Sequence, residues 1–466
     1  MSRSDCSGYR QADFGDIFET LSDRHRKTSL AEVTENYGNL SEKRKMKSDG
    51  INETEALMNL VKALIGTGMM SLPFAFHCAG LWTGIGLLLF TVFLSIHCMR
   101  QLVHAAHYFN YLTGLSSFTY AELGALCCKI GPAWLKRHCN TAKVFIIIEL
   151  CVTQLGICCV YFVFIAENTK QALQNFVEGY TIETIMFLIL PFILIVCSIR
   201  KLRYLAFIAG IANIMFLIAF GLTLQYIMRD LPPISRLPAF NSFSTLPLAF
   251  GTIVFSFEGI NLVLPIENRS RNPRRFIAPV GTLNIACLFV LVIYILIGFF
   301  GYAKFGFDIK DSVTLNLPSN EPLYQAVKGI IAASICLSYP VQFFVPMELL
   351  IIRLKQHFDK DWRWFWLAEY ACRYLFVAVT FSLAELVPHL ALFVSLVGAL
   401  TCSSLALLFP PIMELLIECY DKPKTVIWLF KVTKNILICL FGTIGCISGS
   451  YVSICQIVAA FRQEAK

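Results

Sequence analysis

The chain has 466 residues, of which 56% are hydrophobic and only 15% are charged, and its mean hydropathy is +0.64. Soluble globular proteins carry about 25% charged residues, so this composition excludes an ordinary soluble domain. The formal net charge of +8 does not indicate a nucleic-acid partner, because the basic loops of a membrane protein account for such an excess.

Residues 1–55 differ from the rest of the chain. They hold 9 Lys and Arg against 11 Asp and Glu, and they contain no long apolar stretch. This composition predicts a disordered N-terminal tail. Within it, "YGNL" at Tyr37–Leu40 fits a tyrosine-based sorting pattern. We therefore expect either the plasma membrane or the late endosome and lysosome as the location.

Eleven apolar segments follow, and most reach the roughly 20 residues that a membrane-spanning helix needs. The segments are 57–79, 81–108, 141–166, 182–199, 204–227, 243–266, 277–301, 322–350, 367–386, 389–413 and 432–458. The chain is therefore predicted to be an all-α polytopic membrane protein. Its transmembrane domain spans residues 56–460, and a short C-terminal tail follows at 461–466.

The connectors between these segments differ in basic residues. One alternating set, at 109–140, 200–203, 267–276, 351–366 and 414–431, holds 17 Lys and Arg, whereas the other set holds 5. Because cytoplasmic loops are enriched in Lys and Arg, the first set and the N-terminus are predicted to face the cytoplasm.

The first segment contains residues that a helix interior usually disfavours. The stretch "LIGTGMMSLPFAFHCAG" carries Gly66, Gly68 and Pro73. Unwound backbone at membrane depth is tolerated only where it is buried in protein or lines a polar cavity. We therefore predict that this helix is broken at Gly66–Gly68 and that the break lines a binding site.

The sixth segment repeats the pattern. It reads "LAFGTIVFSFEGINLVLP" and is interrupted by Gly251, Glu258 and Gly259. Interruptions at corresponding positions of two halves indicate an inverted-repeat transporter with its substrate site at the breaks. For Gly251, a role in the site and a role in close helix packing are both open.

A broken helix exposes two new ends. The half after the break offers free amides and a partial positive charge, and the half before it offers free carbonyls and a partial negative charge. A zwitterion fits this arrangement, with its carboxylate on the amides of Thr67–Met70 and its ammonium on the carbonyls of Ala63–Ile65. The carbonyls of Phe255 and Ser256 complete the predicted ammonium pocket.

Few ionisable residues lie inside the apolar segments, where they are costly and therefore functional candidates. The candidates among them are Lys62, Glu149, Glu258, His77 and His97. Glu258 is a candidate for coupling or gating, and a static hydrogen-bonded role is the alternative. The same two alternatives stand for Glu149 and His77, whereas Lys62 fits a structural role better.

The sequence offers no constellation for an enzyme or a metal site. There is no CxxC…CxxC or HExxH spacing and no Ser/His/Asp arrangement, so we expect no catalytic residues, no bound metal and no cofactor. Most of the 18 Cys lie inside apolar segments, where they act as small buried hydrophobes.

Several long motifs, in order, resemble one family. They are "NLVKALIGTGMMSLPFAFHCAG", "ELCVTQLGICCVYFVFIAENTKQ", "FSFEGINLVLPIENRSRNPRRF", "GYAKFGFDIKDSVTLNLP", "LSYPVQFFVPMELL" and "LALFVSLVGALTCSSLALLFPPIMEL". The chain resembles the amino acid/auxin permease superfamily and, within it, the proton-coupled amino acid transporter branch.

The resemblance implies a LeuT-type fold with two inverted repeats, at 56–228 and 243–413, discontinuous helices 1 and 6, and an added helix 11 at 432–458. It implies symport of small neutral amino acids with a proton toward the cytoplasm. It places the substrate between segments 1, 3, 6 and 8, with these candidate binding residues: Ile65, Gly66, Thr67, Gly68, Phe255, Ser256, Phe257, Gln154, Tyr161 and Tyr339. The candidates for proton coupling or gating remain Glu258, Glu149, His77 and Lys62.

One position departs from the family. Mammalian members have a His in the run that leads into the glycine doublet, and Asn59 stands there in this chain. Because Asn does not titrate, either another group carries the proton or coupling is weak or absent. The alternatives are an uncoupled facilitator and an amino acid sensor whose N-terminal tail docks a signalling partner.

Overall fold

The computed structural model describes residues 50–115, 117–174, 179–199, 202–357, 365–386, 389–421 and 426–464. These residues are predominantly helical, and their single β-type contact is an isolated bridge between Ile51 and Ser270. The "YGNL" pattern and the predicted tail up to residue 49 lie outside the described residues.

The first half of the chain forms the helices that carry segments 1 to 5. They are Glu53–Leu64 (α3), Leu72–Ala79 (α4), Leu81–Thr113 (α5), Tyr120–Ile130 (α6), Ala133–Lys136 (α7), Cys139–Ala172 (α8), Ile182–Cys197 (α9) and Leu202–Ile227 (α10). The second half forms Leu246–Ser256 (α11), Ile260–Arg269 (α12), Pro273–Phe276 (α13), Thr282–Phe305 (α14), Pro322–His357 (α15), Phe365–Glu385 (α16), Leu390–Val397 (α17), Phe409–Asp421 (α18) and Val426–Glu464 (α19).

The helices are long and apolar enough for a membrane protein. Among the described residues, nine helical spans are long and apolar enough to cross a membrane, and the bent pair formed by α3 and α4 makes a tenth if it is taken as one span. The helix α9, in predicted segment 4, is apolar but has only 16 residues. Large apolar side chains on α10, such as Phe207 and Ile214, point outward and are 70% and 63% exposed, as contact with lipid requires.

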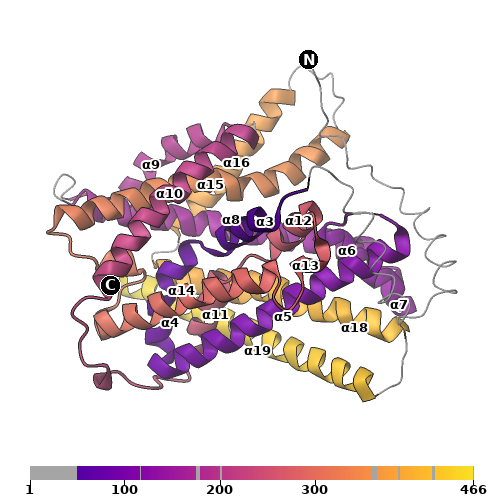
Figure 1. Ribbon diagram of the computed structural model, residues 1–466. Helices are drawn as coiled ribbons and strands as arrows, with labels where there is room; N and C mark the ends of the chain where they lie inside the picture. Colours follow the sequence, from indigo (N-terminus) through magenta and orange to yellow (C-terminus); the bar gives the residue numbers. More distant parts are fainter. Residues whose placement is uncertain are drawn as a thin grey trace.

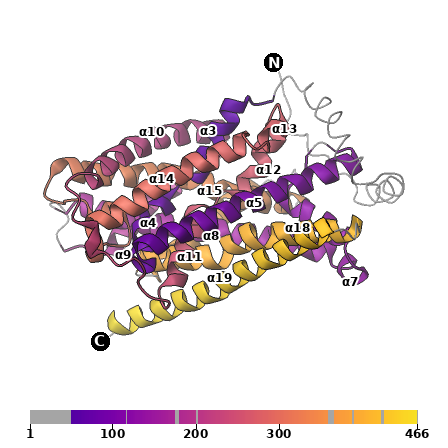
Figure 2. The ribbon, with the colours of Figure 1, turned by 60° about the horizontal axis from the view of Figure 1, so that its bottom comes forward.

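The spanning helices form two groups. The helices α8, α9, α10, α15 and α16 pack on one another, and α3, α4, α5, α11 and α14 form a second group that also contacts α17, α18 and α19. Figure 1 shows the first group above the second, and Figure 2 shows α19 lying along the edge of the bundle beside α18 and α5.

The short helices between the spans lie at one end of the bundle. In Figure 1, α6, α7 and α13 are all on the side opposite α4. The helices α6 and α7 belong to the connector 109–140, for which no helix was predicted. Thr119 and Glu122 form a capping box at the start of α6, in which each residue's side chain accepts a hydrogen bond from the other's amide. That pattern is the sequence signal for this helix.

The start of α17 is capped from the connector before α15. The Asp311 carboxylate accepts a hydrogen bond from the Ala391 amide at 3.1 Å. Burial raises the pKa of Asp311 above its ordinary value, and the amides of α17 and the nearby His389 oppose this shift only in part. The cap therefore fixes α17 at the cost of burying a carboxylate.

Candidate functional site

The first break separates α3 from α4. The helix α3 ends at Leu64, Ile65 and Gly66 have extended backbone, and Thr67–Ser71 form a 3-10 turn. The axes of the two parts differ by 47°. The first two amides of the 3-10 turn have no acceptor within it, because a helix leaves its initial amides free. The predicted interruption of segment 1 is therefore present in the structure.

The second break separates α11 from α12 at Phe257–Gly259. Gly251, which was also a candidate, lies a turn and a half earlier. A Cβ atom added to Gly251 would lie 2.2 Å from the Ser395 carbonyl oxygen, and one added to Gly398 would lie 1.9 Å from the Gly251 carbonyl oxygen. Gly251 therefore allows α11 to pack directly on the α17 region.

The two breaks lie against each other at two glycines. A Cβ atom added to Gly68 would lie 2.6 Å from the Ser256 Cα atom, and one added to Gly259 would lie 2.6 Å from the Leu64 side chain. Gly68 thus lets the end of α11 lie against the first break, and Gly259 lets the end of α3 lie against the second break. The carbonyl ends of α3 and α11 converge as a result.

Tyr294 of α14 joins these two ends. Its hydroxyl lies 2.6 Å from the Leu64 carbonyl oxygen and is also within hydrogen-bonding distance of the Ser256 carbonyl oxygen. The Tyr294 side chain is fully buried, and its ring meets Phe257 edge-on with centroids 6.1 Å apart. Sequence analysis did not identify Tyr294.

Gly66 faces open space. No atom lies within 4 Å of the position that a Cβ would occupy on Gly66, in contrast to Gly68 two residues later. The free amides of the 3-10 turn begin directly after Gly66. The candidate site therefore combines open space at the Gly66 Cβ position, amide donors and two converging carbonyls.

The candidates from segment 6 form the wall of this site. Phe255, Ser256 and Phe257 are all buried. The Ser256 hydroxyl donates to the Thr252 carbonyl at 2.7 Å, so it is used within α11. The Phe255 carbonyl accepts from the Glu258 amide at 3.2 Å. The Phe255 and Ser256 carbonyls were expected to receive the ammonium. In this structure they already accept hydrogen bonds, from the Glu258 amide and the Tyr294 hydroxyl respectively.

The candidates from segments 3 and 8 lie in the other helix group. Tyr339 donates to the Thr380 hydroxyl at 2.8 Å, because Thr380 itself donates to the Val377 carbonyl. The Tyr339 ring contacts Phe162 and Phe343 rather than the break residues. Tyr339 is therefore engaged with α16.

Two candidates on α8 are buried. Tyr161 and Gln154 are 6% and 5% exposed. The amide oxygen of Gln154 has no hydrogen-bond partner among the residues that the structure describes. Gln154 is therefore a buried acceptor that a ligand could use, whereas the Tyr161 side chain is hydrogen-bonded to Gln342.

Glu258 lies within the second break. Its carboxylate accepts from the Asn261 side chain at 2.7 Å, so it bridges the unwound residues and the first turn of α12. Lys62 is exposed on α3, one turn before the first break, and Asn59 is exposed on the same helix face. These residues give the break a polar approach along α3.

The other two ionisable candidates lie away from the breaks. Glu149 of α8 accepts a hydrogen bond from Ser404, which joins two helices in the way that its structural alternative predicted. His77 lies near the end of α4, where its ring is 5.7 Å from that of Tyr302 and 6.0 Å from that of Phe307. The structure does not bring either residue to Gly66.

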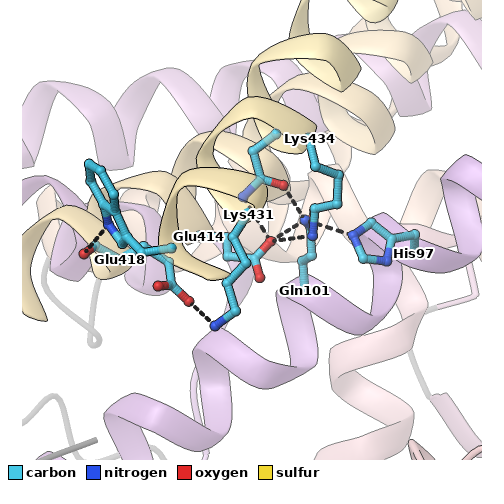
Figure 3. A network of polar contacts seen from close by, with 8 residues as sticks. His97, Gln101, Glu414, Glu418, Lys431 and Lys434 are labelled. Carbon is cyan, nitrogen blue, oxygen red and sulfur yellow. Dashed lines mark hydrogen bonds and ion pairs between the residues drawn. The ribbon is translucent and has the colours of Figure 1, made fainter. Parts of the chain in front are cut away.

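A separate polar cluster contains His97. Figure 3 shows His97 and Gln101 of α5 facing Glu414 of α18 and Lys434 of α19. Lys431 of α19 also binds Glu418 of α18 at 2.5 Å. These contacts fasten α19, the eleventh predicted segment, to the rest of the bundle.

The arrangement at the breaks suits binding rather than bond-making chemistry. It offers backbone donors, backbone acceptors and one nearby carboxylate. The described residues contain no group of three or more His, Cys, Asp or Glu that could hold a metal ion.

The chain is similar to known proteins over most of its length. Residues 49–455 match the family model described as transmembrane amino acid transporter protein. The "Proton-coupled amino acid transporter-like protein pathetic" of Drosophila melanogaster is 32% identical over 416 residues, which cover 88% of this chain and 86% of that protein. The "Probable amino acid transporter skat-1" of Caenorhabditis elegans is 26% identical over 424 residues, which cover 89% and 92%.

Proposed function

Because this chain belongs to the transmembrane amino acid transporter family, the amino acid/auxin permease family, we propose that it carries small neutral amino acids together with a proton toward the cytoplasm. The family is one of transporters and not of enzymes. A small-molecule amino acid substrate and a membrane setting follow from membership.

The observation that carries the proposal is the meeting of the two breaks. The carbonyl ends of α3 and α11 converge within reach of Tyr294, no atom lies within 4 Å of the Cβ position at Gly66, and the initial amides of the 3-10 turn follow Gly66 in the chain. A helix C-terminus attracts a cation and a helix N-terminus attracts an anion. An amino acid backbone carries both charges, and glycine at position 66 lets it approach the chain closely because glycine has no Cβ.

Proton coupling is the less direct part of the proposal. The name of the Drosophila relative includes proton coupling, and Glu258 lies in the second break within reach of the unwound backbone. Asn59 cannot titrate, so Glu258 is our first candidate for the proton carrier.

The surroundings of the first segment indicate the side from which the proposed site is accessible. The outer half-helix α4 is buried at nearly every position, whereas α3 exposes Glu55, Asn59 and Lys62 at helical spacing before Gly66. Polar residues on an exposed face favour water over lipid. The open space at Gly66 is therefore best reached along α3, from the end that the basic connectors assign to the cytoplasm.

The proposed architecture is a LeuT-type repeat with eleven spans. The count takes the bent pair α3 and α4 as one span and includes the shorter helix α9. Breaks in segments 1 and 6, and two groups of helices around them, support the inverted repeat.

For the compartment we keep both the plasma membrane and the late endosome or lysosome. In either location the cytoplasm is the receiving side, and the acidic side supplies the proton.

The test is uptake by proteoliposomes from a panel of labelled amino acids, with pH and sodium gradients imposed independently. We expect one or more small neutral amino acids to accumulate under a proton gradient without sodium. An uptake rate that does not depend on the pH gradient would exclude proton coupling and favour an uncoupled facilitator. Saturable binding without flux would favour the sensor.

A further inference from the structure

Tyr294 has an unusual position. It is a fully buried residue in the middle of α14, and its hydroxyl meets the last carbonyl of α3, that of Leu64, and the last carbonyl of α11, that of Ser256. These acceptors lie 230 and 38 positions away in the sequence. The contact therefore depends on how the two broken helices and α14 are packed.

The packing of α14 explains why Tyr294 reaches the breaks. Tyr294, Gly298 and Gly301 share one helix face, by their spacing of four and three residues. Added Cβ atoms would lie 2.6 Å from Phe76 at Gly298 and 2.5 Å from Pro73 at Gly301. The two glycines therefore let α14 lie close against α4, and the next residue on that face is Tyr294.

The Tyr294 hydroxyl faces more hydrogen-bond acceptors than it has donor hydrogens. A phenol has one donor hydrogen, and two carbonyl oxygens converge on it. Both carbonyls are helix C-termini, which carry partial negative charge. One N–H or O–H donor cannot satisfy both acceptors fully, so this point of the structure favours an additional positively charged donor.

We infer that Tyr294 is a positioning residue for the amino group of the substrate, an inference that rests on the proposed function. Without substrate, its hydroxyl holds the two helix ends at the spacing of a single bridging donor. When the substrate enters beside Gly66, its ammonium takes over the Leu64 carbonyl, which lies two residues before the open space. Tyr294 then donates to the Ser256 carbonyl, and its oxygen accepts an N–H of the substrate.

This role differs from that of a plain strut. A strut would stabilise the protein equally with and without ligand. A positioning residue instead changes the affinity for ligands that carry N–H donors, because its oxygen and the carbonyl it releases are both partners of the ammonium.

The experiment is equilibrium binding of the labelled amino acid that the wild type accumulates best, measured on purified full-length protein in nanodiscs. Tyr294→Phe removes one buried oxygen. We expect the dissociation constant to rise roughly tenfold to a hundredfold, as the loss of a hydrogen bond to a charged group predicts.

Tyr302→Phe is the matched control. Tyr302 is also a buried tyrosine of α14, and its hydroxyl has no hydrogen-bond partner within the part of the chain that the structure describes. We expect its affinity to stay at the wild-type value. Wild-type affinity in Tyr294→Phe would overturn the inference and leave transport intact, whereas a wild type that binds no amino acid would remove the proposed function itself.

A second measurement applies if Tyr294→Phe does not fold. Replacing Tyr294 by 3-fluorotyrosine and by 3,5-difluorotyrosine keeps the hydroxyl but makes its oxygen a progressively weaker acceptor. We expect affinity for the amino acid to fall along this series. An affinity that is the same for all three side chains would show a strut and overturn the inference.

Discussion

Gly66 and Gly68 are two residues apart in the sequence and have opposite surroundings in the structure. A side chain at Gly66 would enter open space, whereas a side chain at Gly68 would collide with the backbone of Ser256. Glycine at position 68 therefore serves helix packing, whereas position 66 is the one that we propose for the ligand.

Gly66→Val tests the role of the open space. The extended backbone at Gly66 accepts valine, so we expect normal expression and thermal stability. Uptake should fall to less than about a tenth of the wild-type rate, because the substrate loses its close approach to the backbone. Gly86→Val, at another glycine without neighbours within 4 Å, should keep normal uptake.

Gly68→Val, unlike Gly66→Val, should lower the stability of the protein. Overpacking against Ser256 is expected to lower stability by about 1–3 kcal/mol or to prevent folding. If Gly66→Val instead lost expression while Gly68→Val was stable, the assignment of the two glycines would be wrong.

Glu258→Gln tests whether Glu258 carries the coupled proton. Glutamine keeps an acceptor for Asn261 but cannot titrate, so we expect uptake to become less dependent on external pH while substrate binding persists. Uptake should be measured between pH 5 and 8 for this variant and for Glu149→Gln, whose carboxylate joins two helices through Ser404. A pH profile of Glu258→Gln identical to that of the wild type would return Glu258 to the static alternative.

At the scale of elements, the site is made by helix ends rather than by side chains. The helices α3 and α11 stop in the middle of the bundle and aim their carbonyls at the same tyrosine. The helices next to these breaks are held in place by close contacts of α14 with α4 and of α11 with α17. The position of α17 therefore matters for the site.

Asp311 caps the start of α17, and the burial of its carboxylate predicts that the stability of the protein depends on pH. Because burial raises its pKa, the folded state favours the protonated form, and the stability that this contributes is lost as pH rises through the folded pKa. His389, Glu167 and Cys78 are its electrostatic neighbours.

Asp311→Asn keeps an acceptor for the Ala391 amide and removes the disfavoured charge. We expect its melting temperature at pH 7 to equal or exceed that of the wild type, with less change between pH 4 and 7. Asp311→Ala loses the cap and should be less stable by roughly 1 kcal/mol. If asparagine destabilised as much as alanine, the charge itself would be favourable and our account of Asp311 would be wrong.

For the whole molecule, the sequence predicts the helical spans better than the site. The apolar segments are clear because lipid requires long runs of apolar residues. The first break is clear because glycine and proline are unfavourable there. In the structure, α3 begins at Glu53 and α19 extends over Val426–Glu464, so spans are longer than their apolar cores.

Tyr294 could not be found from the sequence. A single tyrosine in "VLVIYILIGF" has the pattern of any apolar helix. Its partners are backbone carbonyls of distant residues, which leave no mark in the local pattern. In contrast, Tyr339, suggested by resemblance, is paired with Thr380 in the structure. The assignment of Tyr339 to the substrate stays a prediction from the resemblance.

The most direct test is a cryo-electron microscopy structure of the full chain with the amino acid that it accumulates best. We predict density for the substrate beside Gly66, with its amino group in hydrogen-bonding distance of the Leu64 carbonyl and its carboxylate at the amides of Thr67 and Gly68. Substrate density elsewhere, with both breaks empty and Tyr294 still on both carbonyls, would contradict the account.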